Sequence, residues 1–146
     1  MFNRAPRGTL GLANPSGWMT TELFLQVLED FIKYSTRYLR VPSLLIFDNH
    51  ESFVTVEVVM QAQEAGVHIL MLPPYCSNKL EPLDVAVFGP FKAYYNAACE
   101  AWLLNHPGEP ITIYNTAELV DTAHDKALLP QNILSGFEKA DICPIN

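Results

Sequence analysis

LLIFDNHESFVTVEVVMQAQEAGVHILMLPP, residues 44–74, is the stretch that decides the fold of this chain. Apolar runs at 44–47 and 67–72 are typical of buried strands, and the second run stops at a Pro-Pro pair. Residues 54–65 contain valines that favour a strand, but their length and their Glu, Gln and Ala content favour a helix with Gly66 as its C-cap. The order strand, helix, strand predicts a βαβ unit with two parallel strands, the first covered on both faces.

The rest of the chain is predicted to be helical around this unit. Residues 1–19 are rich in Gly, Pro, Asn and Ser, and we expect a loop or a short extended segment there. Residues 20–146 are expected to form one α/β domain, because 146 residues suffice for a single buried core. Apolar residues at helical spacing predict helices at about 21–38, from Val87 onward with an aromatic face in the core, at 119–128 and at 131–138.

Composition excludes several classes of protein. The net charge is −7, with nine Lys and Arg against sixteen Asp and Glu, which opposes non-specific DNA binding by this segment alone. No apolar run approaches the roughly 20 residues of a membrane span, and the first residues make a poor signal peptide, so we expect an intracellular protein. The three cysteines are widely spaced and fit reduced structural thiols better than disulfides or a zinc site.

Two aspartates are the main candidates for chemistry. Asp48 directly follows the first strand, and Asp84 opens the helix that comes after the second strand and a polar loop at 75–82. Because parallel strands end at the same edge of a sheet, we expect both carboxylates at that edge. Carboxylates are hard oxygen ligands for Mg²⁺ or Mn²⁺, as metal-assisted phosphoryl transfer requires. The alternative is that Asp48 begins a turn and Asp84 caps a helix.

Other polar residues are secondary candidates. His50 and Lys79 could contact a phosphate near the same edge. An exposed turn histidine is equally ordinary, and a solvated loop lysine is the more common case. His68 lies within an apolar strand, and we expect it in the core or at its rim. His106 and His124 have no partner at i+4 that would make a zinc site. The chain contains no G-x-S-x-G motif and no phosphate-binding loop, so nucleophilic hydrolases are disfavoured.

Three longer strings resemble the DDE superfamily endonuclease domain of pogo-, Tigger- and jerky-type transposases, the group from which centromere protein B-like proteins derive. They are LLIFDNHESF at 44–53, LMLPPYCSNKLEPLDVAVFGPFKAYY at 70–95 and NILSGFEKADICPIN at 132–146. The upstream SGWMTTELFLQVLEDFI at 16–32 resembles the family's approach to its second acid. The resemblance therefore covers about 9–146.

This resemblance implies an RNase H-like fold and a triad of acids that binds Mg²⁺ or Mn²⁺. An enzyme of this kind would hydrolyse a DNA strand at transposon ends and join the freed 3′-hydroxyl to target DNA. Asp48 matches the second acid of the triad and Asp84 matches the third. The resemblance also implies DNA as the partner and the nucleus as the location.

The chain departs from the family pattern at several positions. The family usually carries His where Phe53 and Asn78 stand here, and Gln where Glu81 stands. Its first acid lies on an earlier strand, in a three-stranded antiparallel unit, whereas no Asp or Glu precedes Glu22 in this sequence. We therefore expect an incomplete RNase H-like fold: two parallel strands with flanking helices, without the early antiparallel strands and the first acid.

Two classes of function remain open at this point. The retained Asp48 and Asp84 favour a metal-dependent DNA nuclease and strand transferase in its complete form. Phe53, Asn78 and the absent first acid favour a catalytically dead, domesticated or decaying remnant that binds a protein partner at an exposed sheet edge. A third class, an unrelated hydrolase, would show activity that resists metal chelation.

Overall fold

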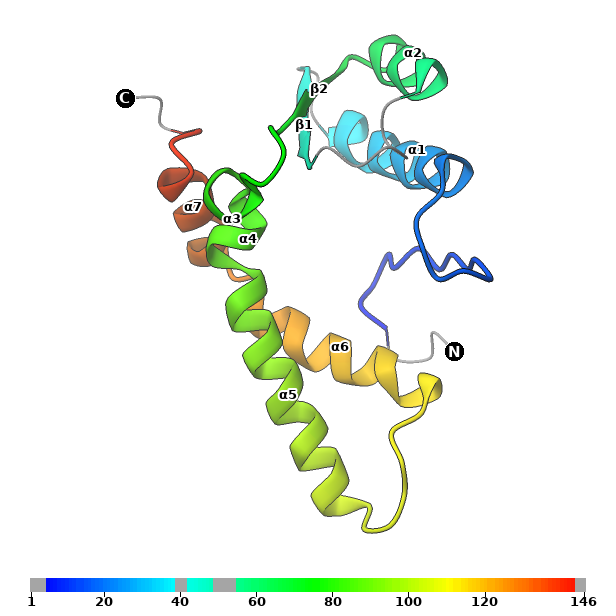
Figure 1. Ribbon diagram of the computed structural model, residues 1–146, viewed down its shortest axis with the longest axis vertical. Coiled ribbons are helices and arrows are strands. Elements are labelled where there is room, and N and C mark those ends of the chain that lie inside the picture. The colour runs from blue at the N-terminus through cyan, green and yellow to red at the C-terminus, as the bar shows by residue number, and fades with distance from the viewer. Residues whose placement is uncertain (1–4, 39–41, 49–54, 144–146) are drawn as a thin grey trace. The chain divides into compact units, whose positions relative to one another are not determined.

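In the computed structural model, the stretch at 44–74 forms the predicted strand, helix and strand (Figure 1). Strand β1 spans Ser43–Phe47, helix α2 spans Val56–Glu64 and strand β2 spans Val67–Met71. The two strands pair in parallel, with Leu45 opposite Ile69 in the register. The predicted βαβ unit and its parallel pairing are confirmed.

The structure describes residues 5–38, 42–48 and 55–143. By their contacts, these residues fall into two units. The strand unit comprises residues 10–76, and the helical unit combines residues 5–9 with residues 77–143.

Capping residues set the helix ends of the strand unit. Helix α1 spans Thr21–Tyr38, as predicted, and the Thr20 hydroxyl accepts a hydrogen bond of 3.4 Å from an amide of the first turn. The Thr55 hydroxyl does the same at α2, also at 3.4 Å. Helix α2 ends at the C-cap Ala65, one residue before the predicted Gly66, which follows with a φ of +70°. That positive φ explains why glycine occupies the position.

Both helices of the strand unit pack on the same face of the sheet. The opposite face carries Leu44 and Leu70, whose side chains are 52% and 44% exposed. Within the strand unit, α1 and α2 therefore cover only one face of β1, which differs from the prediction that both faces are covered. The buried core consists of Phe24, Leu28, Val58, Ala62 and Val67, with Leu45, Phe47 and Ile69 packed against it.

Helices make up the regular structure of the helical unit. The loop predicted at 75–82 in fact contains a short helix, α3. Helix α6 begins well before the predicted start at Leu119, because Thr112 and Asn115 form a capping box. In it, the Asn115 side chain accepts a hydrogen bond of 2.9 Å from the Thr112 amide. The helices are α3 at Ser77–Leu80, α4 at Pro82–Ala86, α5 at Phe88–Asn105, α6 at Ile113–Ala127 and α7 at Pro130–Lys139.

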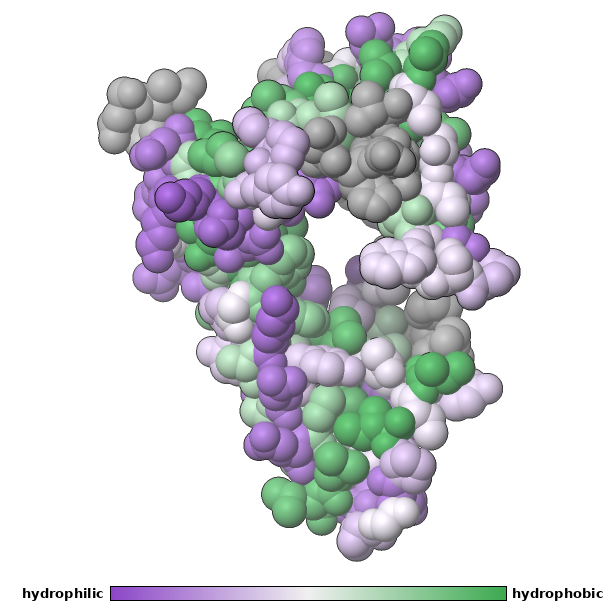
Figure 2. Space-filling view, in the orientation of Figure 1, coloured by the Kyte–Doolittle hydropathy of each residue, from purple (hydrophilic) through white to green (hydrophobic). Residues whose placement is uncertain are grey.

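The aromatic face predicted for α5 is only partly buried, and no described residue of α5 is fully buried. Tyr94 is 41% exposed, and the Lys126 ammonium lies 5.8 Å from the centre of its ring. Hydrophobic residues also reach the surface where α5 ends (Figure 2). The half-buried members of the predicted face are Phe91, Tyr95, Ala98 and Trp102.

Tyr95 joins α5 to α6. Burial raises the pKa of its phenol, and the neighbouring Cys99 raises it further, whereas a hydrogen bond with the Thr116 side chain acts in the opposite direction. Since Thr116 lies on α6, this contact ties the two long helices together.

Helix α7 packs closely against α4. A Cβ atom built on Gly136 would lie 2.5 Å from the carbonyl oxygen of Pro82, so a side chain has no room there. Both residues are buried. Gly136 therefore allows α7 to contact the backbone of the helix that carries Asp84.

Candidate functional site

Asp48 stands directly after β1, at the carboxyl end of the strand. A hydrogen bond holds the strand end to its neighbour: the Phe47 carbonyl accepts a hydrogen bond of 2.9 Å from the Leu72 amide. The Phe47 ring packs edge-on against Phe24, with 5.5 Å between ring centres. Asp48 itself is exposed. A well-packed strand end thus presents its carboxylate to solvent.

Asp84 lies in the first turn of α4, not at the start of the long helix α5. The sequence-based prediction that it opens a helix after β2 is right, but that helix is a separate short one and follows α3. Pro82 occupies the first turn of α4 and is buried against α7. Because Pro82 is anchored and Asp84 is exposed, the second candidate carboxylate also projects from a fixed backbone into water.

The secondary candidates are placed unequally. Lys79 lies in the last turn of α3 and is exposed, as is Asn78. His50 and Phe53 lie outside the described residues. The Lys79 ammonium is therefore accessible to an anion. Its role in binding a phosphate stays a prediction.

Asp48 belongs to the strand unit, and Asp84 and Lys79 belong to the helical unit. Their meeting at one edge of the sheet remains a prediction. Within the described residues, no group of three or more His, Cys, Asp or Glu side chains could hold a metal ion. Two exposed carboxylates fit Mg²⁺ or Mn²⁺ in the chemistry of their donor atoms, because these ions prefer oxygen ligands and retain several waters.

The other described histidines do not gather at a site. His68, expected in the core or at its rim, is exposed on the open face of the sheet. His106 stacks on Trp102 with 4.1 Å between ring centres, and its Nδ1 lies 2.8 Å from the Trp102 carbonyl oxygen. This pair closes the end of α5, which is a structural role.

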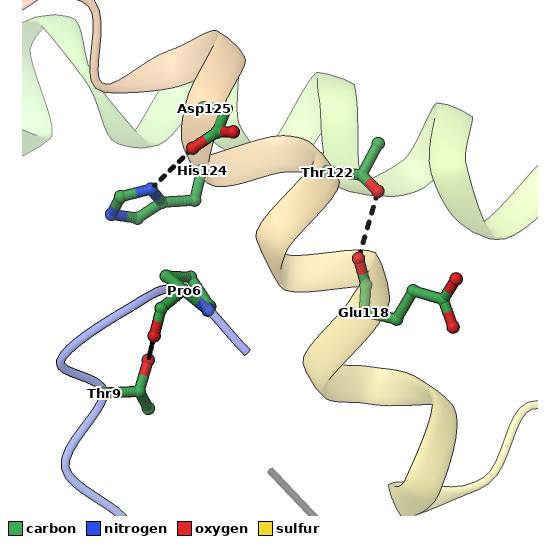
Figure 3. A network of polar contacts seen from close by, with 6 residues as sticks. All are labelled: Pro6, Thr9, Glu118, Thr122, His124 and Asp125. Carbon is green, nitrogen blue, oxygen red and sulfur yellow. Dashed lines mark hydrogen bonds and ion pairs between the residues drawn. The ribbon is translucent and has the colours of Figure 1, made fainter. Parts of the chain in front are cut away.

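The polar contacts around α6 are likewise local (Figure 3). The imidazole of His124 lies 3.5 Å from the carboxylate of the next residue, Asp125. The Thr122 hydroxyl donates to the Glu118 carbonyl at 3.0 Å, and the Thr9 hydroxyl donates to the Pro6 carbonyl at 2.7 Å. Each contact joins residues of one segment, so they stabilise helix and turn and do not assemble a reactive centre.

The structure indicates one further candidate residue that was not predicted from the sequence. Tyr75 lies in the loop between β2 and α3, has a φ of +61° and is fully exposed. The available signal in the sequence was the Pro-Pro pair before an aromatic residue, which predicts a turn but does not predict its handedness.

No helix among the described residues has the length and apolar character needed to cross a membrane.

Comparisons with known proteins identify the family. The family model described as DDE superfamily endonuclease matches residues 12–137, a range that includes both Asp48 and Asp84. A protein named MFS-type transporter clz9, from Cochliobolus lunatus, is 33% identical over 141 residues, which cover 96% of this chain and 15% of that protein. No solved structure matches. By the family match over most of its length, this chain belongs to the DDE superfamily endonuclease family.

Proposed function

We propose that this chain contributes the second and third acids of an RNase H-like nuclease domain in a pogo-, Tigger- or jerky-type transposase. In this proposal residues 20–146 form part of that domain, and the complete protein cleaves and transfers DNA strands in the nucleus. The family match across 12–137 carries the proposal. The chain spans about 15% of the length of the relative that it matches, so these activities are proposed for a whole protein.

Asp48 and Asp84 are the proposed metal ligands and catalytic residues. DDE endonuclease domains generally bind DNA and use divalent metal ions. When bound, Mg²⁺ or Mn²⁺ supplies Lewis-acid activation of water and of a phosphate oxygen. The two carboxylates hold the ion, and their exposure at fixed backbone positions suits a ligand that arrives from solvent together with DNA. Lys79 and His50 are proposed to orient the phosphate.

Because the chain is negatively charged, part of the DNA affinity must come from groups outside its own side chains. Nine Lys and Arg residues against sixteen Asp and Glu cannot neutralise many phosphates. The proposed metal site and other segments of the whole protein supply the remaining positive charge.

The open sheet face favours a second candidate function. Leu44 and Leu70 are exposed on it, and within the described residues β1 and β2 each have a single neighbouring strand. Isolated two-stranded sheets are marginal in water, and parallel sheets are normally covered on both faces. A non-enzymatic module that binds a protein partner at the free sheet edge would explain this surface without any metal.

Thermal unfolding in Mn²⁺ separates the two candidates. A metal that binds only the folded protein stabilises it by about 1.4 kcal/mol at ten times its dissociation constant. We expect millimolar Mn²⁺ to raise the Tm of the wild-type chain by a few degrees and to have no such effect on D48N or D84N.

The controls are E29Q and E100Q, which each remove one exposed carboxylate elsewhere, the first from the strand unit and the second from the helical unit. Both variants should keep the shift. An equal loss in the controls would indicate diffuse binding to surface acids, and the absence of a shift in the wild-type chain would favour the binding module.

A further inference from the structure

The backbone of Tyr75 has a conformation that this residue type rarely adopts. Among the described residues, Tyr75 and Asp141 alone combine a positive φ with a side chain, at +61° and +55°. Asp tolerates the left-handed region, whereas a bulky aromatic residue there is an outlier. Tyr75 is the second of two turn residues after Pro73, a position at which a turn with positive φ normally takes Gly or Asn.

The end of a helix explains the positive φ of Asp141 but does not explain the positive φ of Tyr75. Asp141 follows the C-cap of α7; its amide donates to the Glu138 carbonyl at 3.1 Å, and the Ile142 amide donates to the Phe137 carbonyl at 3.1 Å. These two bonds form a Schellman motif, which requires a left-handed residue at this place. Tyr75 follows a strand, so no helix end demands its conformation.

Among the described residues, no hydrogen bond or ring contact of the Tyr75 side chain offsets that conformation. Its relative exposure is 102%, the highest among the large apolar and aromatic side chains of the described residues. Residues held in strained conformations cluster at active sites and at segments that clamp a ligand. The two prolines that precede Tyr75 each have a fixed φ, so the loop before Tyr75 is stiff. This stiff loop presents the tyrosine ring to solvent.

We infer that Tyr75 stacks on an unpaired base of the DNA strand, an inference that rests on the proposed function. Tyr75 lies in the segment that links β2 to the helices carrying Lys79 and Asp84, the proposed phosphate contact and metal ligand. Stacking on an aromatic ring is independent of phosphate charge. It therefore suits a chain whose net charge of −7 limits attraction to the backbone.

The test measures binding of the whole chain to a fluorescein-labelled single-stranded oligonucleotide in millimolar Mn²⁺. A second oligonucleotide of equal length and charge, with abasic positions at its centre, reports whether bases are contacted. Loss of one stacked base weakens binding by roughly 5- to 150-fold. We expect that loss in Y75A and Y75G, and on the abasic oligonucleotide, whereas Y75F should bind like the wild-type chain.

Two comparisons separate stacking from damage to the fold. Y75G relieves the positive φ, so its Tm should not fall, yet its affinity for the oligonucleotide should. Y114A removes another exposed tyrosine, 70% exposed on α6, and should leave the affinity unchanged.

Failure of the inference and failure of the proposed function give different results. If Y75A binds like the wild-type chain while D84N binds more weakly, the DNA and metal site stands and the stacking role is overturned, which leaves a protein partner as the ligand of Tyr75. Equal affinity for the abasic oligonucleotide also overturns stacking. A wild-type chain that gains stability from Mn²⁺ but does not bind the oligonucleotide overturns the stacking role alone. A wild-type chain that neither binds the oligonucleotide nor gains stability from Mn²⁺ overturns both.

Discussion

The strand unit and the helical unit are held together in different ways. The strand unit buries large side chains, with Leu28 and Val58 fully excluded from solvent beneath the sheet. In the helical unit Val87 and Leu119 are buried together with small residues such as Ala123 and Ala127, and the backbones of α7 and α4 approach closely at Gly136. Apolar burial therefore stabilises both units, and the helical unit adds a close approach of two helix backbones.

The contrast shows how each unit supports its candidate ligand. Asp48 follows a strand that is anchored by ring packing, and Asp84 sits on a short helix that is anchored by Pro82 against Gly136. Both carboxylates are exposed. The groups proposed for chemistry are therefore distinct from the groups that hold the fold, and substitutions should separate the two.

L28A should have the largest effect on stability. Leu28 is 0% exposed in the core of the strand unit, so truncation removes apolar contacts and leaves a cavity. We expect a loss of about 2–5 kcal/mol in the free energy of unfolding, measured by urea denaturation. The control L44A lies on the open sheet face and should cost well under half as much. A comparable loss in L44A would mean that a further layer covers that face in solution.

G136A should have the next largest effect, through the opposite mechanism. The added Cβ would lie 2.5 Å from the Pro82 carbonyl oxygen, so α7 and α4 must separate. Overpacking of this kind costs about 1–3 kcal/mol. The matched control is G89A in α5, where an added Cβ meets nothing within 4 Å. G89A should leave the free energy of unfolding unchanged or raise it; if G136A is equally harmless, the two helices do not approach as described.

The sequence predicted the strand unit better than the helical unit, for physical reasons. Apolar runs and a flanking helix at 44–74 specify a βαβ unit, because strand and helix periods differ and parallel strands need a crossover. The early start of α6 was missed because its first turn is polar or exposed, and the signal there is the capping pair Thr112 and Asn115. The role of Gly136 depends on a contact with a segment distant in sequence, which no local pattern encodes.

The candidate ligands could be named from the sequence because their positions depend on element ends. Asp48 follows an apolar strand, and Asp84 lies two residues after a helix-starting proline. Tyr75 could not be named in the same way. Its handedness and its exposure are properties of the folded loop, and a Pro-Pro-Tyr string is compatible with several turns.

We propose that Asp48 and Asp84 hold the same divalent ion. The most direct test records backbone amide signals of the whole chain by NMR while substoichiometric Mn²⁺ is added, since this paramagnetic ion broadens the signals of nearby amides. We expect the amides around Phe47 and those around Asp84 to broaden together at the lowest Mn²⁺ concentrations. D48N alone, or D84N alone, should restore both sets of signals. Broadening confined to one of the two segments, or spread evenly over the acidic residues of the surface, would contradict a shared metal site.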